Sequence, residues 1–233
     1  MLGCKSQAIN ARSGRTCACL IGILLLLLFV VATRAQDADY LRTISQRAEK
    51  IIAALNLPET SRSNRVHAIL VRQYRDLNEI HSVRDADIAA AKAKLNGDKS
   101  AANSAVESAR AAAKAKTDKL HGEFLARLSA ELSPEQVDKV KDGMTYGVLP
   151  LTHGVYLRMY PDLKDAEKKQ IWDWLVEARE IAMDGSTSNE KHAVFGKYKG
   201  RINNYLSKAG YDAKKGEANL RKPAPSNPET KSK

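Results

Sequence analysis

A segment near the middle of the chain constrains the fold most strongly. Residues 86–116 contain thirteen alanines, interleaved with lysine, aspartate, arginine and glutamate. Alanine is the best helix-forming residue, but its side chain buries little apolar surface. Asn96-Gly97-Asp98 offers a turn inside this segment. We therefore predict a long antiparallel helical hairpin with its tip at this turn, stiff, thinly packed and partly exposed.

The rest of the chain shows the 3.6-residue periodicity of amphipathic helices, and no segment has the clear alternation of a strand. Pro58 ends the first helix, which is expected over residues 37–55, because proline cannot continue the helical hydrogen bonds. Ser133 and Gln136 form a capping box at the start of another helix. Further helices are expected from Asp165 to Gly185 and in the segment that ends at Gly210.

Residues 143–163 interrupt the helical pattern with three glycines and two prolines. We predict a loop there, with one short helix at residues 155–159. The predicted fold is all-α: a single helical bundle of about six helices, including the alanine-rich hairpin, over residues 36–212. About 175 folded residues suffice for one hydrophobic core.

The N-terminus has the layout of a secretory signal peptide. Its first cations, with no acid among them, precede an apolar run over residues 19–32, and small residues follow. That run of about 14 residues is shorter than the roughly 20 that a membrane-spanning helix needs. We predict a signal peptide at residues 1–35, with an uncleaved N-terminal anchor as the alternative. No stable membrane span is expected in the mature chain.

The cysteines and the charge indicate the compartment and the partners. All three cysteines lie within residues 1–35, so the mature chain has no disulfide and no thiol nucleophile. Removal of those residues lowers the net charge from +11 to +7. For a basic periplasmic or secreted protein, nucleic acid is a poor partner. Carbohydrate or anionic glycan, a membrane surface and unfolded envelope proteins are better ones, unless the charge serves only solubility.

Residues 213–233 are rich in lysine and proline and have almost no apolar side chains. Such a composition cannot bury enough surface to offset the entropy of ordering. We predict a disordered Lys/Pro-rich tail, above all in its second half.

Aromatic residues are concentrated in the later part of the chain. Nine of the thirteen lie between Tyr146 and Tyr211. Carbohydrate sites use aromatic faces for sugar rings and amides, carboxylates and cations for the hydroxyls, whereas a helical core also needs large side chains. The helical wheel places Tyr198 and Tyr205 on an apolar face, which favours the core. Trp172 lies off the apolar face of its own helix.

The candidate ligand-binding residues combine rings with a polar stripe. Lys197, Arg201 and Asn204 follow one another at helical spacing beside the apolar face. This stripe is either one side of a ligand groove or a plain solvated edge. We predict that these three side chains supply polar contacts, and that a second set supplies ring faces: Trp172, Tyr146 and Tyr156.

No pattern indicates catalysis. The five histidines form no HExxH or other metal signature. His81 and Asp85 share a helix face, but two groups cannot complete a metal or acid–base site, which favours a surface or hydrogen-bonded histidine. We predict no catalytic residue, no metal and no cofactor, and the chain is more consistent with a binding protein than with an enzyme.

Four segments carry a family resemblance. Residues 46–57, 65–81, 137–163 and 192–212 resemble, in order, the bacterial family catalogued as domain of unknown function 3826. This resemblance covers most of residues 40–212. It implies a secreted, largely helical, sugar-binding protein associated with polysaccharide use, and it transfers no catalytic residue.

A shorter motif is similar to another family. Leu132–Gln136, "LSPEQ", is similar to the LTxxQ motif of helical periplasmic chaperones, whose basic concave surfaces hold unfolded chains. The predicted function is thus a secreted, non-enzymatic, carbohydrate-binding protein. A periplasmic envelope chaperone of the LTxxQ type is the first alternative, and a glycan-processing enzyme is the second.

Overall fold

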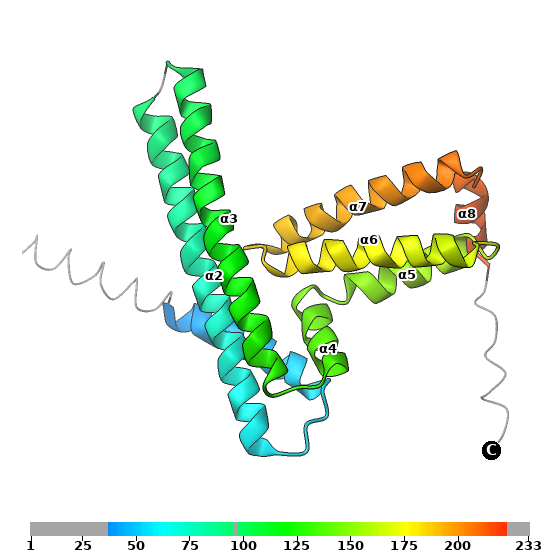
Figure 1. Cartoon of the computed structure of the whole chain (residues 1–233), viewed down its shortest axis with the longest axis horizontal. Helices are drawn as coiled ribbons and strands as arrows, with labels where there is room; N and C mark the ends of the chain where they lie inside the picture. The colour runs from blue at the N-terminus through cyan, green and yellow to red at the C-terminus, as the bar shows by residue number, and fades with distance from the viewer. Residues whose placement is uncertain (1–36, 96, 223–233) are drawn as a thin grey trace, which may run out of the picture. The chain divides into compact units, whose positions relative to one another are not determined.

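The computed structural model describes residues 37–95 and 97–222, and throughout these residues the chain forms helices and turns without a strand (Figure 1). The predicted all-α fold is confirmed. The described residues fall into two units, divided between Gln46 and Arg47. In the first, residues 37–46 are helical, and the predicted signal peptide lies outside the described residues. No helix in the described part of the chain is long and apolar enough to cross a membrane.

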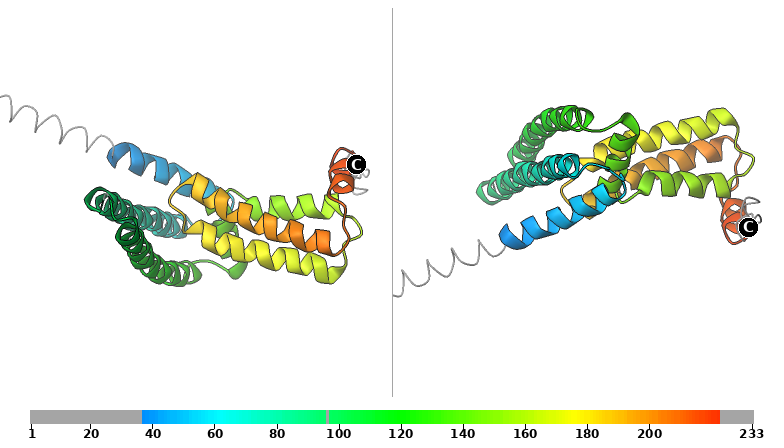
Figure 2. Two further views of the ribbon diagram at one scale, coloured as in Figure 1. Left: turned by 90° about the horizontal axis from the view of Figure 1, so that it is seen from above. Right: turned by 90° about the horizontal axis from the view of Figure 1, so that it is seen from below.

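The second unit begins with helical residues 47–53 and continues with the predicted hairpin. Its arms are α2 (Thr60–Lys94) and α3 (Lys99–Ser129), which lie side by side in both Figures 1 and 2. Gly97 takes a positive φ of +119°, a conformation that glycine adopts at little cost. The Asp98 side chain then accepts a hydrogen bond from the Ala101 amide at 3.0 Å and caps α3.

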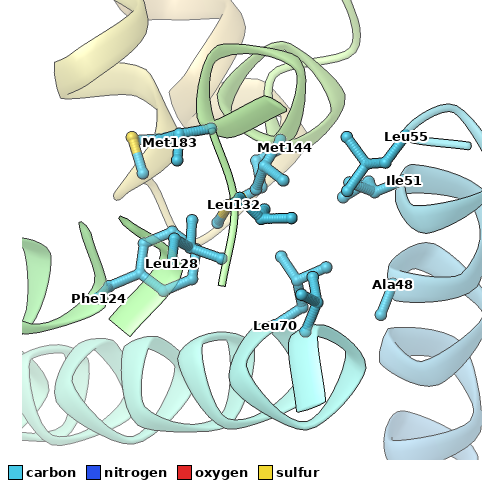
Figure 3. Close-up of a cluster of buried hydrophobic side chains, with 12 residues drawn as sticks. Ala48, Ile51, Leu55, Leu70, Phe124, Leu128, Leu132, Met144 and Met183 are labelled. Atoms are coloured by element: carbon cyan, nitrogen blue, oxygen red, sulfur yellow. The ribbon is translucent and has the colours of Figure 1, made fainter. Parts of the chain in front are cut away.

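The base of the hairpin belongs to the first of two hydrophobic cores. Phe124 and Leu70 are fully buried there, against residues 48–55 and α4 (Pro134–Met144) (Figure 3). Gly143 of α4 allows the helix backbone to pack closely against Ile51, because a Cβ at position 143 would lie 2.7 Å from Ile51 Cγ1. The complete cluster of buried side chains is Ala48, Ile51, Leu55, Val66, Leu70, Phe124, Leu128, Leu132, Val137, Val140, Met144 and Met183.

The second core lies among the helices that follow. These are α4 (Pro134–Met144), α5 (Val148–Met159), α6 (Asp165–Met183), α7 (Ser188–Lys208) and α8 (Ala213–Leu220). The predicted capping box at Ser133 and Gln136 is present. Ile171, Leu175 and Ala178 of α6 are fully buried in this core, as the apolar stripe predicts. Ile181 continues the same stripe but exposes 51 % of its surface.

The prediction of a mostly irregular segment at residues 143–163 is wrong. Helix α5 begins at Val148, seven residues before the predicted short helix. Gly147, with a φ of +65°, turns the chain just before it. Pro150 lies in the first turn, where the amide nitrogens need no helical partner, so it does not interrupt the helix.

The structure also differs from the predicted disordered tail at its start. Residues 213–220 form α8, which Asp212 caps by accepting hydrogen bonds from the Lys214 and Lys215 amides. The Asn219 side chain donates a 2.9 Å hydrogen bond to the Met159 carbonyl of α5. The remainder of the predicted tail, residues 223–233, lies outside the described residues.

Two buried cations connect helices. Arg179 of α6 donates to Asp138 at 2.6 Å and to Asp142 at 2.9 Å on α4. Lys191 of α7 donates to the carbonyls of Met144 at 3.0 Å and Met183 at 3.3 Å. These carbonyls belong to the last residues of α4 and α6, so one ammonium group satisfies the ends of two helices.

Candidate functional site

The six predicted ligand-binding residues lie in different places. Tyr156 is 4 % exposed, and its hydroxyl donates a 2.8 Å hydrogen bond to Asn203 Oδ1. Burial raises the pKa of Tyr156 to about 12. This ring is a core residue, and the prediction that it offers a face to a ligand is wrong for this conformation.

Tyr146 and Trp172 are the two predicted rings that remain accessible, with exposed fractions of 49 % and 42 %. Tyr146 stacks on His192, with centroids 5.7 Å apart and planes 14° apart. Trp172 contacts His153 edge-to-face at 5.0 Å. The two rings therefore have separate partners, and neither lines the hollow that contains the predicted polar residues.

The predicted polar residues do share one hollow. Lys197, Arg201 and Asn204 line an open groove of about 630 Å³ along α7. We call it the α7 groove, and its complete lining is Trp174, Lys197, Gly200, Arg201, Asn204, Tyr205 and Lys208. The helical spacing in the sequence brings the polar side chains to one face, and Trp174 comes from the neighbouring helix α6.

The rings of the α7 groove are held in a defined arrangement. Trp174 meets Tyr205 edge-to-face, with centroids 5.3 Å apart and planes 88° apart. The Arg201 guanidinium lies over the indole, 4.4 Å from its centroid, in a cation–π contact. Arg201 also forms an ion pair with Glu177 at 3.6 Å. These contacts fix the position of the cation at the centre of the groove.

The α7 groove is electropositive. Lys197, Arg201 and Lys208 contribute three cations, and among residues 37–95 and 97–222 no carboxylate lines the groove. Tyr198 stays a neutral phenol, because burial and, after it, the hydrogen bond and charge of Glu177 raise its pKa to about 12. The groove therefore offers cations, an amide and partly accessible aromatic edges, a set that suits an anionic polar ligand.

Trp172 is exposed, as the sequence predicts, but the sequence analysis did not place Trp174 in this groove. The wheel placed Trp174 near the apolar face of α6 and Trp172 off it, so Trp172 was expected to be the exposed ring. The structure places Trp174 at the border of the second core, where it is partly buried and its face meets Arg201. A helical wheel can identify a ring at the edge of an apolar stripe. It cannot show which side chain of another helix that ring will contact.

His81, which the sequence analysis paired with Asp85, connects α2 to the end of α6. His81 is buried, its Nε2 lies 2.8 Å from the Asp184 carbonyl, and its Nδ1 lies 2.8 Å from Arg84 Nη1. Since arginine only donates and a carbonyl only accepts, His81 carries its proton on Nε2. His81 is thus a hydrogen-bonded histidine, as predicted, and Asp85 pairs with Arg84 instead.

A second histidine, His121, also binds Asp184, and the sequence analysis did not single it out. His121 Nδ1 donates to Asp184 Oδ2 at 2.8 Å, and its Nε2 lies 3.6 Å from Glu180 Oε2. The hydrogen bond that His121 donates to Asp184 raises the pKa of His121, although burial opposes this. Within residues 37–95 and 97–222, no group of three or more histidine, cysteine or acidic side chains is placed to hold a metal ion.

The comparison with known families agrees with the resemblance in the sequence. The family model described as "Protein of unknown function (DUF3826)" matches residues 41–224. No curated protein matches the chain. The matched range includes helices α2 to α8 and therefore the whole α7 groove. Since the match spans well over half of the sequence, the chain belongs to the family described as protein of unknown function (DUF3826).

Proposed function

We propose that this protein is a secreted, non-enzymatic, carbohydrate-binding protein that holds an anionic glycan in the α7 groove. The observation that carries the proposal is the convergence of Lys197, Arg201 and Asn204 with the ring of Trp174 in one hollow. Cations pair with glycan carboxylates or sulfates, amides bind hydroxyls, and ring surfaces contact the apolar side of sugars.

The length of the groove suits an oligosaccharide. Lys197 and Lys208 lie eleven residues apart on α7, which corresponds to roughly 16 Å along a helix axis. A polymer with regularly spaced negative charges can contact several cations along that line at once. Because these cations are exposed, binding should weaken as salt rises.

The test compares charged and neutral polysaccharides by affinity electrophoresis and titration calorimetry. We expect binding to polygalacturonate, no binding to dextran, and an affinity lowered about tenfold, or about 1.4 kcal/mol, in the double variant Lys197→Gln/Arg201→Gln. Lys116→Gln/Lys199→Gln makes the same charge change at two exposed lysines outside the groove, so it should lose much less affinity.

Two outcomes would overturn the proposal. The first is that the wild-type protein binds neither polygalacturonate nor another anionic glycan. The second is that both double variants lose the same affinity, which would indicate a general charge effect rather than a site. Trp172→Ala should leave binding unchanged, since Trp172 lies outside the groove.

A further inference from the structure

A larger hollow lies elsewhere in the second unit. It has a volume of about 880 Å³, and its walls come from α2, α3, the end of α6 and the start of α7. We call it the hairpin cleft, and it shares no residue with the α7 groove. Ligand pockets commonly have volumes of about 300–1,000 Å³, so the size suits a small ligand or a short segment of chain.

The hairpin cleft is elongated along the hairpin. Its α3 wall runs from Arg110 through Lys114 and Thr117 to His121, residues spaced three or four positions apart on one helix face. Eleven residues of helix span roughly 16 Å. That length equals about five residues of extended chain. The form of the cleft therefore favours a chain-like occupant.

One wall of the hairpin cleft is apolar. Ile181 exposes 51 % of its surface although it continues the buried stripe of α6. Ile88 and Val194, both partly exposed, line the same hollow, and the buried Ala113 adds a small side chain from α3. An apolar side chain of a partner would remove this surface from water, which is favourable.

The side chains that line the hairpin cleft include more carboxylates than lysines and arginines, the reverse of the whole chain. Lysine and arginine outnumber acids 38 to 27 in the whole sequence. The cleft instead has five carboxylates against three such cations: Asp85, Asp118, Glu180, Asp184 and Glu190 against Arg84, Arg110 and Lys114. Positive charge on a partner complements this surplus.

Two of these carboxylates have free capacity. Asp184 Oδ1 is buried and has no hydrogen-bond partner in the structure. Asp118 pairs with Lys114 one turn away on α3, and both side chains are more than half exposed. Such surface pairs contribute about 0–1 kcal/mol, so a partner's cation can replace Lys114 at little cost.

The wall around Asp184 is held rigidly. His81 of α2 and His121 of α3 both bind Asp184, one at its carbonyl and the other at its carboxylate. Arg84 adds an ion pair with Glu190 of α7 at 3.2 Å. The cleft is thereby formed before any partner arrives, which lowers the entropy cost of binding.

We propose that the hairpin cleft is a second binding site, which takes an extended peptide segment with an apolar side chain beside a lysine or arginine. This site is separate from the α7 groove and goes beyond the proposed glycan binding. The surplus of carboxylates in the lining favours peptides that carry positive charge.

The test measures fluorescence anisotropy of labelled pentapeptides on the full mature chain. Lys-Leu-Lys-Leu-Lys should bind, whereas Glu-Leu-Glu-Leu-Glu and Lys-Ser-Lys-Ser-Lys should bind at least tenfold more weakly. Ile181→Ser should weaken binding of the first peptide about tenfold, and Asp118→Asn about threefold. Leu151→Ser is the matched control, because Leu151 is 70 % exposed and lies outside the cleft.

The following outcomes would refute the peptide proposal. Equal binding of the acidic peptide, or unchanged binding in Ile181→Ser, would refute the peptide site. Equally tight binding of dodecyltrimethylammonium would refute a chain-like occupant and indicate a site for small cationic amphiphiles. Ile181→Ser should keep polygalacturonate binding, and Lys197→Gln/Arg201→Gln should keep peptide binding, so the failure of one proposal is separable from the failure of the other.

Discussion

The buried ammonium of Lys191 makes a sharp prediction about stability and pH. Lys191 is 5 % exposed, and within the described part of the chain it is hydrogen-bonded to two carbonyls and to no carboxylate. Its Nζ also lies 5.9 Å from the centre of the Tyr74 ring. Burial lowers the pKa of Lys191 from 10.5 to about 8, because the charged form loses its hydration, while the charge of Asp184 partly opposes this.

The magnitude follows from that difference in pKa. A fall from 10.5 to about 8 corresponds to about 3 kcal/mol, since each pH unit is worth 1.36 kcal/mol. Below pH 8 the folded and unfolded chains are both charged at Lys191, and the folded state carries the full cost. Between pH 8 and 10.5 the unfolded state binds more protons, so this cost disappears as pH rises.

The variant Lys191→Met removes the charge and keeps an apolar stem of similar length. The free energy of unfolding is measured with urea from pH 7 to 10.5 for both proteins, and the two curves are subtracted. Other titrating groups cancel in the difference. We expect the wild-type protein to gain about 3 kcal/mol relative to the variant over this range, whichever of the two is more stable at pH 7.

The control is Lys199→Met, which removes an exposed lysine from the same helix. It gives the effect of losing a surface lysine from this helix. A level difference curve for Lys191→Met would mean that the Lys191 ammonium is solvated or paired in solution. In that case the inferred burial of a charge between the ends of α4 and α6 would be wrong.

Two further predictions concern the junction at Asp184 and the first core. The pKa of His121 is raised by its hydrogen bond to Asp184, with Glu180 adding to the effect and Lys141 opposing it. The interaction of protonated His121 with Asp184 therefore contributes fully to stability below the ordinary pKa of 6.5. This contribution is lost as pH rises through the raised pKa of His121. Relative to His121→Gln, the wild-type protein should lose stability from pH 6.5 upward in urea titrations, and an increasing difference would contradict this sign. Gly143→Ala should destabilise the protein by about 1–3 kcal/mol in the same assay, because the added Cβ would lie 2.7 Å from Ile51 Cγ1. Gly154→Ala, in a position with nothing within 4 Å, is the control and should not destabilise.

The sequence predicts the helices whose start and stop signals are local. The capping box at Ser133, the turn at Gly97 and the proline at residue 58 each act through the nearest few residues. The start of α5 is different. The glycines and prolines at residues 143–163 are residue types typical of loops. Pro150, however, lies in the first turn of α5, where its missing amide hydrogen costs no helical hydrogen bond.

Helix α8 shows how packing on another element overrides composition. Residues 213–220 contain few apolar side chains, and alone they would not form a stable helix. Gly216 lies against Tyr160, where a Cβ would come within 2.9 Å of the ring, and Asn219 binds the end of α5. These partners lie more than fifty residues earlier in the chain, and no local pattern reveals them.

The sequence also does not show which charged side chains come together in one site. The net charge of +11 suggests one basic surface, and the three cations of the α7 groove are detectable because they repeat on one helix. The carboxylates of the hairpin cleft come instead from positions 85, 118 and 180–190, so only the hairpin and the α6–α7 turn together bring them to one place. A chain that is basic on average thus presents two hollows with opposite preferences. A partner chosen from net charge alone would be matched to only one of them.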